Sequence, residues 1–583
     1  MHALRAPNRY WRLLAHYLRS ELPRMSLLGV ILTGTIAIQV VTPLVASRFI
    51  DRAVAGGAIR GLVVLALLTM GLALAGQVLA VVETYVAEHV SWTATNALRA
   101  DLVAHMLRLD ATFHTAHTPG ELIERVDGDV ATLARFFSRF VIYVLGNGLL
   151  MVGVLALLVH VDWRVGLSLG AFVLIALIVM LRIRAVATPS WAAERQASAD
   201  FYGFLGEYLA GLEDVWSSGA GAFVLRRCAE VMRSWLAVTR VAQMKGYAFI
   251  ASSQGLFALG TAAAFAVSAM LYRDGTLTLG TVYLVFRYTE MLRQPTEQIR
   301  NEVQDLQRAD ASMGRVEALL GTTPRLVDGP DPALPPGPLA VELDSVSFGY
   351  AEDAPVLRDV TVRLGPGRVL GVVGRTGSGK TTLTRLLARF YDPSAGVVRL
   401  GGVDTRTVRL AAVRARIGLV SQEVHLFTAS VRDNVTLFDV DVPDHRITTV
   451  LDTLGLAGWL GELPRGLDTP LGPGGVGLSA GQAQVLAFAR VFLRDPDVVI
   501  LDEASSRLDP ATERLVHGAL GRLLAGRTGV IIAHRLTTVA YADDILVLED
   551  GRVREYGPRQ ALAADPTSHF ARLLRVGAEE VSS

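Results

Sequence analysis

Cysteine and lysine are nearly absent from the 583-residue chain, which contains one cysteine, Cys228, and two lysines, Lys245 and Lys380. A single cysteine excludes an intrachain disulfide and a metal site built from several cysteines. The formal net charge is only +1, so no broad positive field attracts nucleic acid, and none is expected as a partner. Since arginine supplies almost all of the 56 basic residues, a lysine inside a glycine-rich loop suggests a specific task for that ammonium group.

Lys380 belongs to a loop with the pattern Gly-x-x-x-x-Gly-Lys-Thr, which begins at Gly374 and ends at Thr381. In such a P-loop the backbone N–H groups cradle phosphates, the lysine reaches the β- and γ-phosphates, and the hydroxyl binds Mg²⁺. Val369–Val373 is typical of a buried strand that leads into the loop, and Thr381–Arg389 of a helix that follows it. The loop therefore predicts a nucleotide site with bound Mg²⁺.

Long apolar segments fill the first half of the chain. Hydrophobic residues make up 51% of the sequence, the mean hydropathy is +0.39, and most of the apolar residues in long runs precede residue 300. A membrane-spanning helix needs about 20 mostly apolar residues. Six segments approach that length: Met25–Ile50, Gly61–Val86, Phe140–Val161, Val165–Leu181, Gly246–Tyr272 and Leu277–Leu292. Together they predict a multi-pass membrane domain.

Short turns and long polar gaps alternate between these spans. The two long gaps, Glu88–Arg139 and Arg182–Lys245, carry helical patterns and predict helices that run far past the bilayer. Their turns, near Asp110–Gly120 and Gly219–Leu225, are expected to contact the nucleotide domain. Arginines concentrated in the first 24 residues place the N-terminus and both gaps in the cytoplasm, at the inner (plasma) membrane.

Two ionisable residues interrupt the sixth span. Arg287 and Glu290 are three positions apart and share one helix face. Either they line a pathway through the membrane domain, since ionisable groups in a membrane usually face a cavity, or they pair with each other.

The boundaries follow from these patterns and from six prolines between Thr322 and Pro338, which are typical of a linker. We expect a cytoplasmic interfacial helix over residues 1–24, a transmembrane domain over 25–320, a linker over 321–338 and a nucleotide domain over 339–578.

Three further motifs are weak when taken singly. The apolar run from Val498 ends in Asp502 and Glu503, which suit a Mg²⁺ ligand and a group that activates water, although acidic turns after strands are common. Small residues after Leu478 leave helix N–H groups free to meet an anion. His534, at the end of an apolar run, also fits an ordinary buried histidine.

Taken in order, these motifs resemble the ATP-binding cassette (ABC) transporters, and six spans with two long extensions resemble the exporter-type half-transporters of that family. The resemblance implies a six-helix α transmembrane domain of the ABC exporter type joined to an α/β P-loop NTPase domain. It implies ATP hydrolysis coupled to the export of a hydrophobic or amphipathic substrate. The implied partners are a second half-transporter, membrane lipid and a small-molecule, lipid or peptide substrate.

The resemblance also assigns residues to roles. Glu503, His534 and Gln422 are the expected catalytic residues, and Thr381, Gln422 and Asp502 are the expected metal ligands. The expected ATP contacts come from the adenine-stacking aromatic residue, the P-loop, the signature motif and the D-loop: Tyr350, Gly374, Arg375, Thr376, Gly377, Ser378, Gly379, Lys380, Thr381, Thr382, Ser479, Ala480, Gly481, Gln482 and Asp509.

Three residues depart from the family pattern. Ala480 replaces the first glycine of the usual Leu-Ser-Gly-Gly-Gln signature, Pro473 stands where exporters commonly carry a glutamate, and Arg507 occupies a D-loop position that is usually small. An altered signature beside the intact Glu503 favours a heterodimer over a homodimer. Two alternatives stay open: an importer on the exporter scaffold, as in some siderophore uptake systems, and an ATP-gated regulatory membrane protein.

Overall fold

The computed structural model describes residues 15–330, 333–351, 354–422, 424–472, 477–502, 510–533 and 536–582. Contacts divide the chain into two compact units. The membrane unit comprises Met1–Leu107 and Pro119–Thr322, and the nucleotide unit comprises Arg108–Thr118 and Thr323–Ser583. A short segment from the first half of the sequence therefore belongs to the nucleotide unit.

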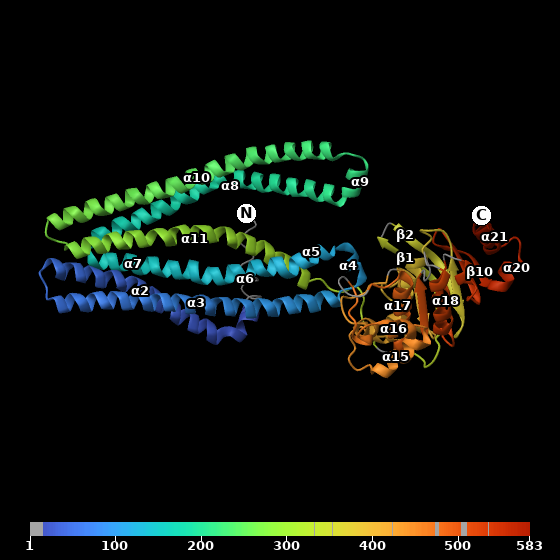
Figure 1. Ribbon diagram of the computed structural model, residues 1–583. Coiled ribbons are helices and arrows are strands. Elements are labelled where there is room, and N and C mark those ends of the chain that lie inside the picture. The colour runs from blue at the N-terminus through green and yellow to red at the C-terminus, as the bar shows by residue number, and fades with distance from the viewer. Residues whose placement is uncertain are drawn as a thin grey trace. The chain divides into compact units, whose positions relative to one another are not determined.

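The membrane unit is helical throughout its described residues, and its long helices lie side by side (Figure 1). Five helical segments are long and apolar enough to cross a membrane within the described part. The bounds of the helices are η1 Arg19–Glu21, α2 Leu22–Val54, α3 Ile59–Arg108, α5 Pro119–Ile123, η2 Glu124–Asp129, α6 Val130–Arg139, η3 Phe140–Gly146, α7 Asn147–Val161, α8 Trp163–Ala210, α9 Leu212–Ser217, α10 Gly221–Arg273 and α11 Leu279–Leu320.

The sixth expected span, Leu277–Leu292, lies at the start of α11. This helix is not among the five apolar ones, because Arg287 and Glu290 lower its hydropathy. Of the expected N-terminal helix, residues 1–14 lie outside the described residues, and Ala15–Leu18 are helical.

Three helices continue far past the length that a bilayer requires, as the polar gaps predicted. The helices α3, α8 and α10 contain 50, 48 and 53 residues. At 1.5 Å per residue, each is roughly 75 Å long, against about 30 Å of hydrocarbon. Their outer portions are therefore built to extend into water, where their polar side chains are solvated.

Two contacts fix α2 against α11. The Asp51 carboxylate accepts hydrogen bonds from the Thr278 hydroxyl at 2.8 Å and from the Gly280 amide at 2.7 Å. A side chain at Gly280 would place its Cβ 2.2 Å from the Ser47 carbonyl oxygen, so the close approach requires glycine. Further along, the buried Tyr288 hydroxyl donates to the Val40 carbonyl at 2.7 Å.

The nucleotide unit contains two sheets. The antiparallel sheet has the order β2-β1-β4-β5, and the larger sheet has the order β10-β9-β3-β8-β7-β6, parallel except for β10. The strands are β1 Val341–Ala351, β2 Ala354–Leu364, β3 Val369–Val373, β4 Ala395–Leu400, β5 Val403–Asp404, β6 Ile417–Val420, β7 Val498–Asp502, β8 Thr528–Ile532, β9 Asp544–Glu549 and β10 Arg552–Pro558.

Helices cover this parallel sheet, which explains why its central strands are apolar along their whole length. Every residue of β3 and β8 is buried, as expected for parallel strands that are covered on both faces. The helices of the unit are α4 Ala111–Ala116, α12 Lys380–Leu387, η4 Thr405–Thr407, α13 Leu410–Ala415, α14 Val431–Thr436, α15 Asp444–Thr453, α16 Ala457–Glu462, η5 Gly466–Asp468, α17 Ala480–Arg494, α18 Pro510–Leu524, α19 Leu536–Val539, α20 Arg559–Ala564 and α21 His569–Ser582.

A buried arginine ties the linker to the nucleotide unit. Arg389 is 1% exposed, and its guanidinium donates to the Val408 carbonyl at 2.7 Å and to the Val327 carbonyl at 2.9 Å. Its Nε also donates to the Asp392 carboxylate at 3.2 Å. The segment that contains Val327 is therefore held by a charge that has almost no access to water.

We predict that Arg389→Leu destabilises the nucleotide unit by about 2–5 kcal/mol, because two carbonyls and a carboxylate lose their donor. The midpoint of thermal unfolding of the full-length protein in detergent measures the effect. Arg363→Leu on β2 is the matched control, because Arg363 is exposed and its replacement is expected to leave the midpoint unchanged. Equal midpoints for the two variants would contradict the prediction.

Candidate nucleotide-binding site

The P-loop turns sharply at glycines that no other residue can replace. Gly374, Gly377 and Gly379 have φ angles of 154°, 83° and 101°, values that side chains disfavour. A Cβ on Gly374 would lie 2.3 Å from the Leu548 carbonyl oxygen, and one on Gly379 would lie 2.6 Å from a Leu357 methyl. Backbone and packing therefore both require the glycines that the motif predicted.

Lys380 curls back over this loop. It is 5% exposed, and its Nζ donates to the carbonyls of Gly374 at 2.8 Å and Arg375 at 2.9 Å. Lys380 also begins α12, so the positive end of that helix faces the loop. The buried hydroxyl of Ser378 has no hydrogen-bond partner among the described residues. A concave loop with a buried ammonium and an unpaired hydroxyl fits the phosphates of a nucleotide.

Residues from neighbouring strands share the edge of the sheet on which the loop lies. Asp502 on β7 pairs in register with Ile532 on β8, and Ile532 pairs with Val372 on β3, just before the loop. Strands two positions apart lie about 10 Å from each other. Gln422 follows β6, which adjoins β7, and its side chain is exposed. The expected metal ligands Thr381, Asp502 and Gln422 thus come from one edge, which is where open α/β sheets bind ligands.

Three predicted site residues, Glu503, His534 and Asp509, lie outside the described residues. In the sequence, Glu503 follows Asp502 directly, and His534 comes two positions after the end of β8. Their roles stay predictions.

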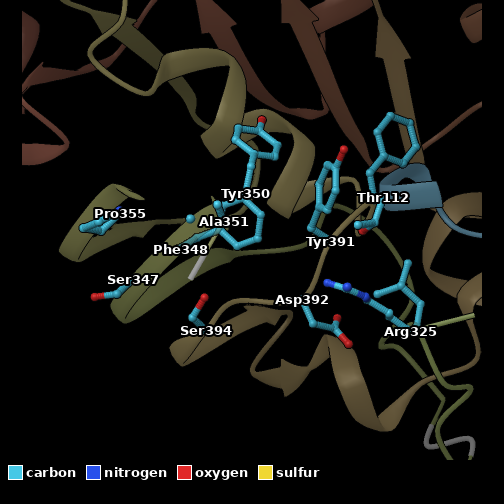
Figure 2. Close-up of a pocket in the computed structure, with 13 residues that line it drawn as sticks. Thr112, Arg325, Ser347, Phe348, Tyr350, Ala351, Pro355, Tyr391, Asp392 and Ser394 are labelled. Carbon is cyan, nitrogen blue, oxygen red and sulfur yellow. The ribbon is translucent and has the colours of Figure 1, made fainter. Parts of the chain in front are cut away.

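Tyr350 lies beside the start of α12 in an aromatic cluster (Figure 2). Its ring is edge-on to Phe348 and Tyr391, with centroids 5.1 Å and 5.3 Å away. The Tyr350 hydroxyl lies 3.2 Å from the Thr382 hydroxyl and accepts from Arg385 at 3.1 Å. With 42% of its surface exposed, Tyr350 has a free area that suits the predicted stacking on a base.

The signature residues form the beginning of α17. The Ser479 hydroxyl accepts from the Gln482 amide at 3.2 Å, and the Gln482 side chain accepts from the Ser479 amide at 3.0 Å. This reciprocal cap fixes the helix start. Ser479 and Ala480 are exposed, whereas Gly481 is buried. Pro473 lies outside the described residues.

The sequence did not predict a second feature beside Tyr350, a cavity of about 330 Å³. Figure 2 shows Thr112 of α4 and Arg325 on one side, Ser347 and Ser394 on the other, and Asp392 beside Arg325. The Thr115 hydroxyl, also on α4, lies 3.4 Å from the Tyr391 hydroxyl. Tyr391 therefore touches both the aromatic cluster and α4. The only sequence feature that could have indicated a role for Tyr391 is its position just after the P-loop helix.

One carboxylate holds α4 in the nucleotide unit. Asp110 caps the helix by accepting from the amides of Thr112 at 3.0 Å and Phe113 at 3.3 Å. Its other oxygen accepts from the Arg325 amide. Burial alone would raise the pKa of Asp110, but the backbone N–H bonds outweigh burial and lower this pKa below its ordinary value. The carboxylate is thus ionised at neutral pH, and its contribution to stability is lost only as the pH falls through that lowered pKa.

The fold and the site define a multi-pass membrane protein with a P-loop ATPase in the same chain. Residues 25–296 match the family described as ABC transporter transmembrane region, and residues 357–506 match the family described as ABC transporter. The chain belongs to the ABC transporter family and is a transport ATPase of its exporter type.

Curated relatives agree with this assignment. The cyclolysin secretion/processing ATP-binding protein of Bordetella pertussis is 33% identical, with 95% of this chain and 78% of the relative covered. The ATP-dependent lipid A-core flippase of Yersinia pestis is 31% identical, with 84% of each covered. A multidrug efflux ATP-binding/permease protein of Mycobacterium tuberculosis is 31% identical over 94% of this chain, which spans about half (46%) of that relative.

A solved structure confirms the predicted fold. The chain is similar to a bacterial Atm1-family ABC exporter with ATP bound, with a TM-score of 0.79 and 24% identity, covering 96% of this chain and 98% of the other. The expected combination of an exporter-type helical membrane domain and an α/β P-loop domain is therefore correct.

We predict that Lys380→Ala weakens ATP binding by about 10- to 100-fold, because a buried charge-assisted contact to the phosphates is lost. Titration with a fluorescent ATP analogue measures the change. Lys245→Ala is the matched control, since Lys245 is the other lysine, is exposed and donates to Ser190 in the membrane unit. Equal affinities for the two variants would refute the role of Lys380.

We also predict that two substitutions at Asp110 separate its two roles. Asn keeps one carbonyl oxygen to cap α4 but has no second acceptor for the Arg325 amide, whereas Ala loses both. Hydrogen exchange by mass spectrometry should show faster exchange around Arg325 in both variants, and faster exchange of Thr112 and Phe113 only in Asp110→Ala. Identical exchange patterns in the two variants would contradict the separation.

Proposed function

We propose that the chain is one subunit of a dimeric exporter that uses ATP to move a hydrophobic or amphipathic substrate out of the cytoplasm. The observation that carries the proposal is the shared sheet edge where the P-loop, Asp502 and Gln422 meet, in a chain that also supplies the membrane helices. The helix lengths and the arginine-rich start support an orientation in the inner (plasma) membrane with the N-terminus and nucleotide unit in the cytoplasm.

In the proposed reaction the protein positions ATP and stabilises charge. Lys380 and the P-loop amides offset the phosphate charge, and Tyr350 stacks on the adenine. Thr381, Asp502 and Gln422 would hold Mg²⁺, which supplies further positive charge at the phosphates. Glu503 polarises the attacking water, and His534 holds the γ-phosphate.

The proposed dimer follows from the signature motif. In the family, the signature serine of one subunit closes on the ATP held by the other, so a single chain makes an incomplete site. The exposed positions of Ser479 and Ala480 suit such a contact. Because Ala480 accompanies the intact Glu503, we favour a second, different half-transporter with the standard signature and a defective glutamate.

Coupling between ATP and transport is proposed to pass through α4. Its links to the nucleotide unit are the Asp110 bond to the Arg325 amide and the approach of Thr115 to Tyr391. Tyr391 packs against Tyr350, so a nucleotide that stacks on Tyr350 would bias the position of α4 through two aromatic rings.

The names of the relatives favour export over the two alternatives. One relative acts in efflux, one in secretion and one as a flippase, and none of the three names describes uptake or gating. An importer or an ATP-gated regulatory protein is therefore the weaker proposal.

We predict that Glu503→Gln lowers the rate of ATP turnover by about 10²–10⁴-fold, because the group that polarises the attacking water is lost. ATP binding is expected to be unchanged, because the P-loop residues that contact the phosphates are intact. Steady-state ATPase activity and binding of the fluorescent analogue are measured on the same preparation. Near-normal turnover in this variant would sink the proposed role of Glu503.

The heterodimer is tested by expressing the chain alone and with a candidate partner encoded beside it. We expect the isolated chain to have low ATPase activity that the partner raises. A dimer of this chain alone with full substrate-stimulated activity would rule the heterodimer out.

A further inference from the structure

The membrane unit contains a cavity of about 540 Å³ between α2, α3, α11 and the η3–α7 segment. These helices lie within the long bundle of Figure 1. Apolar side chains such as Leu32, Ile36 and Leu72 form part of the wall. Five carboxamides interrupt this apolar wall: Gln39, Gln77, Asn147, Gln294 and Gln298. The Asn147 side chain donates a hydrogen bond to the Gln298 side chain. Each carboxamide can both donate and accept more than one hydrogen bond, so the wall matches a ligand that carries amide groups.

Two opposite charges line the same cavity. Glu83, on α3, is 6% exposed, and Arg287, on α11, is exposed. Among the described residues that line it, they are the only acidic and the only basic one. Neither forms an ion pair within the described part of the chain, and Glu290 neither lines the cavity nor pairs with Arg287. Charged groups at membrane depth are costly unless they meet a partner.

Contacts with α2 place the two residues at different levels along that helix. Tyr288, next to Arg287, bonds the Val40 carbonyl, whereas Glu83 lies beside the Thr35 hydroxyl. Val40 comes five positions after Thr35 in α2, which is about 8 Å along the helix. An extended peptide covers about 3.3–3.6 Å per residue, so the two ends of a di- or tripeptide match this separation.

We propose that this cavity binds a short zwitterionic peptide, with its ammonium group at Glu83, its carboxylate at Arg287 and its amides at carboxamides of the same wall. The apolar wall then takes the peptide's side chains. This inference rests on the proposed exporter function and names the substrate class of its pathway.

The test uses the full-length protein in lipid nanodiscs, with any half-transporter that co-purifies, and the tripeptide Leu-Leu-Leu in three forms: free, N-acetylated and C-amidated. Binding is measured by calorimetry. Glu83→Gln is expected to weaken binding of the free peptide by about 10- to 100-fold. Binding of the acetylated peptide should be unaffected, because that peptide has no ammonium group. Arg287→Gln should likewise weaken binding of the free peptide but not binding of the amidated peptide, which has no carboxylate.

Glu290→Gln is the matched control, one turn from Arg287 and outside the cavity lining, and is expected to bind all three peptides normally. If Glu83→Gln weakens the free and acetylated forms equally, Glu83 is structural and the proposal fails. The proposal is also overturned if a hydrophobic cation such as tetraphenylphosphonium binds through Glu83 and tri-leucine does not bind. If no peptide binds but ATP turnover still depends on Glu503, this inference fails while the exporter function stands.

Discussion

The nucleotide unit must hold the charged phosphates at one edge of its parallel sheet. The rest of this unit depends on that constraint. The loop after β3 must let several N–H groups converge, which forces Gly374 and Gly379 into conformations that other residues avoid. The strands that flank it must end at the same level, and the register of Asp502 with Val372 through β8 achieves this. The fully buried central strands make that register rigid.

The lipid bilayer imposes the second constraint. Backbone groups inside lipid must be satisfied within the helix, so the membrane unit consists of long helices. Two of them, α2 and α11, are fastened by a capping carboxylate, Asp51, and by a buried tyrosine, Tyr288. Between the spans the chain leaves the membrane unit once, at Arg108–Thr118, and contributes α4 to the nucleotide unit. A carboxylate at Asp110 secures that crossing.

The sequence predicted the helical spans and the P-loop well, for local reasons. Apolar runs and glycine spacing depend on a few neighbouring residues, so they predicted the loop around Lys380 and the five spans that long apolar helices match among the described residues. The sixth span was the hardest, because Arg287 and Glu290 break its apolar pattern. The structure distinguishes the two residues: Arg287 lines a cavity and Glu290 does not. Periodicity on one helix could not separate them, since they share a face.

The sequence by itself determined the class of protein, the P-loop and the apolar membrane helices, because each depends on residues close together in the chain. Tertiary structure decided the contacts between distant residues. Asp110 and Arg325 are 215 positions apart, and Arg389 reaches Val327 across 62. Glu83 and Arg287 line one cavity although they belong to the second and sixth spans. No local pattern encodes such pairs, since helix packing and strand register alone bring them together.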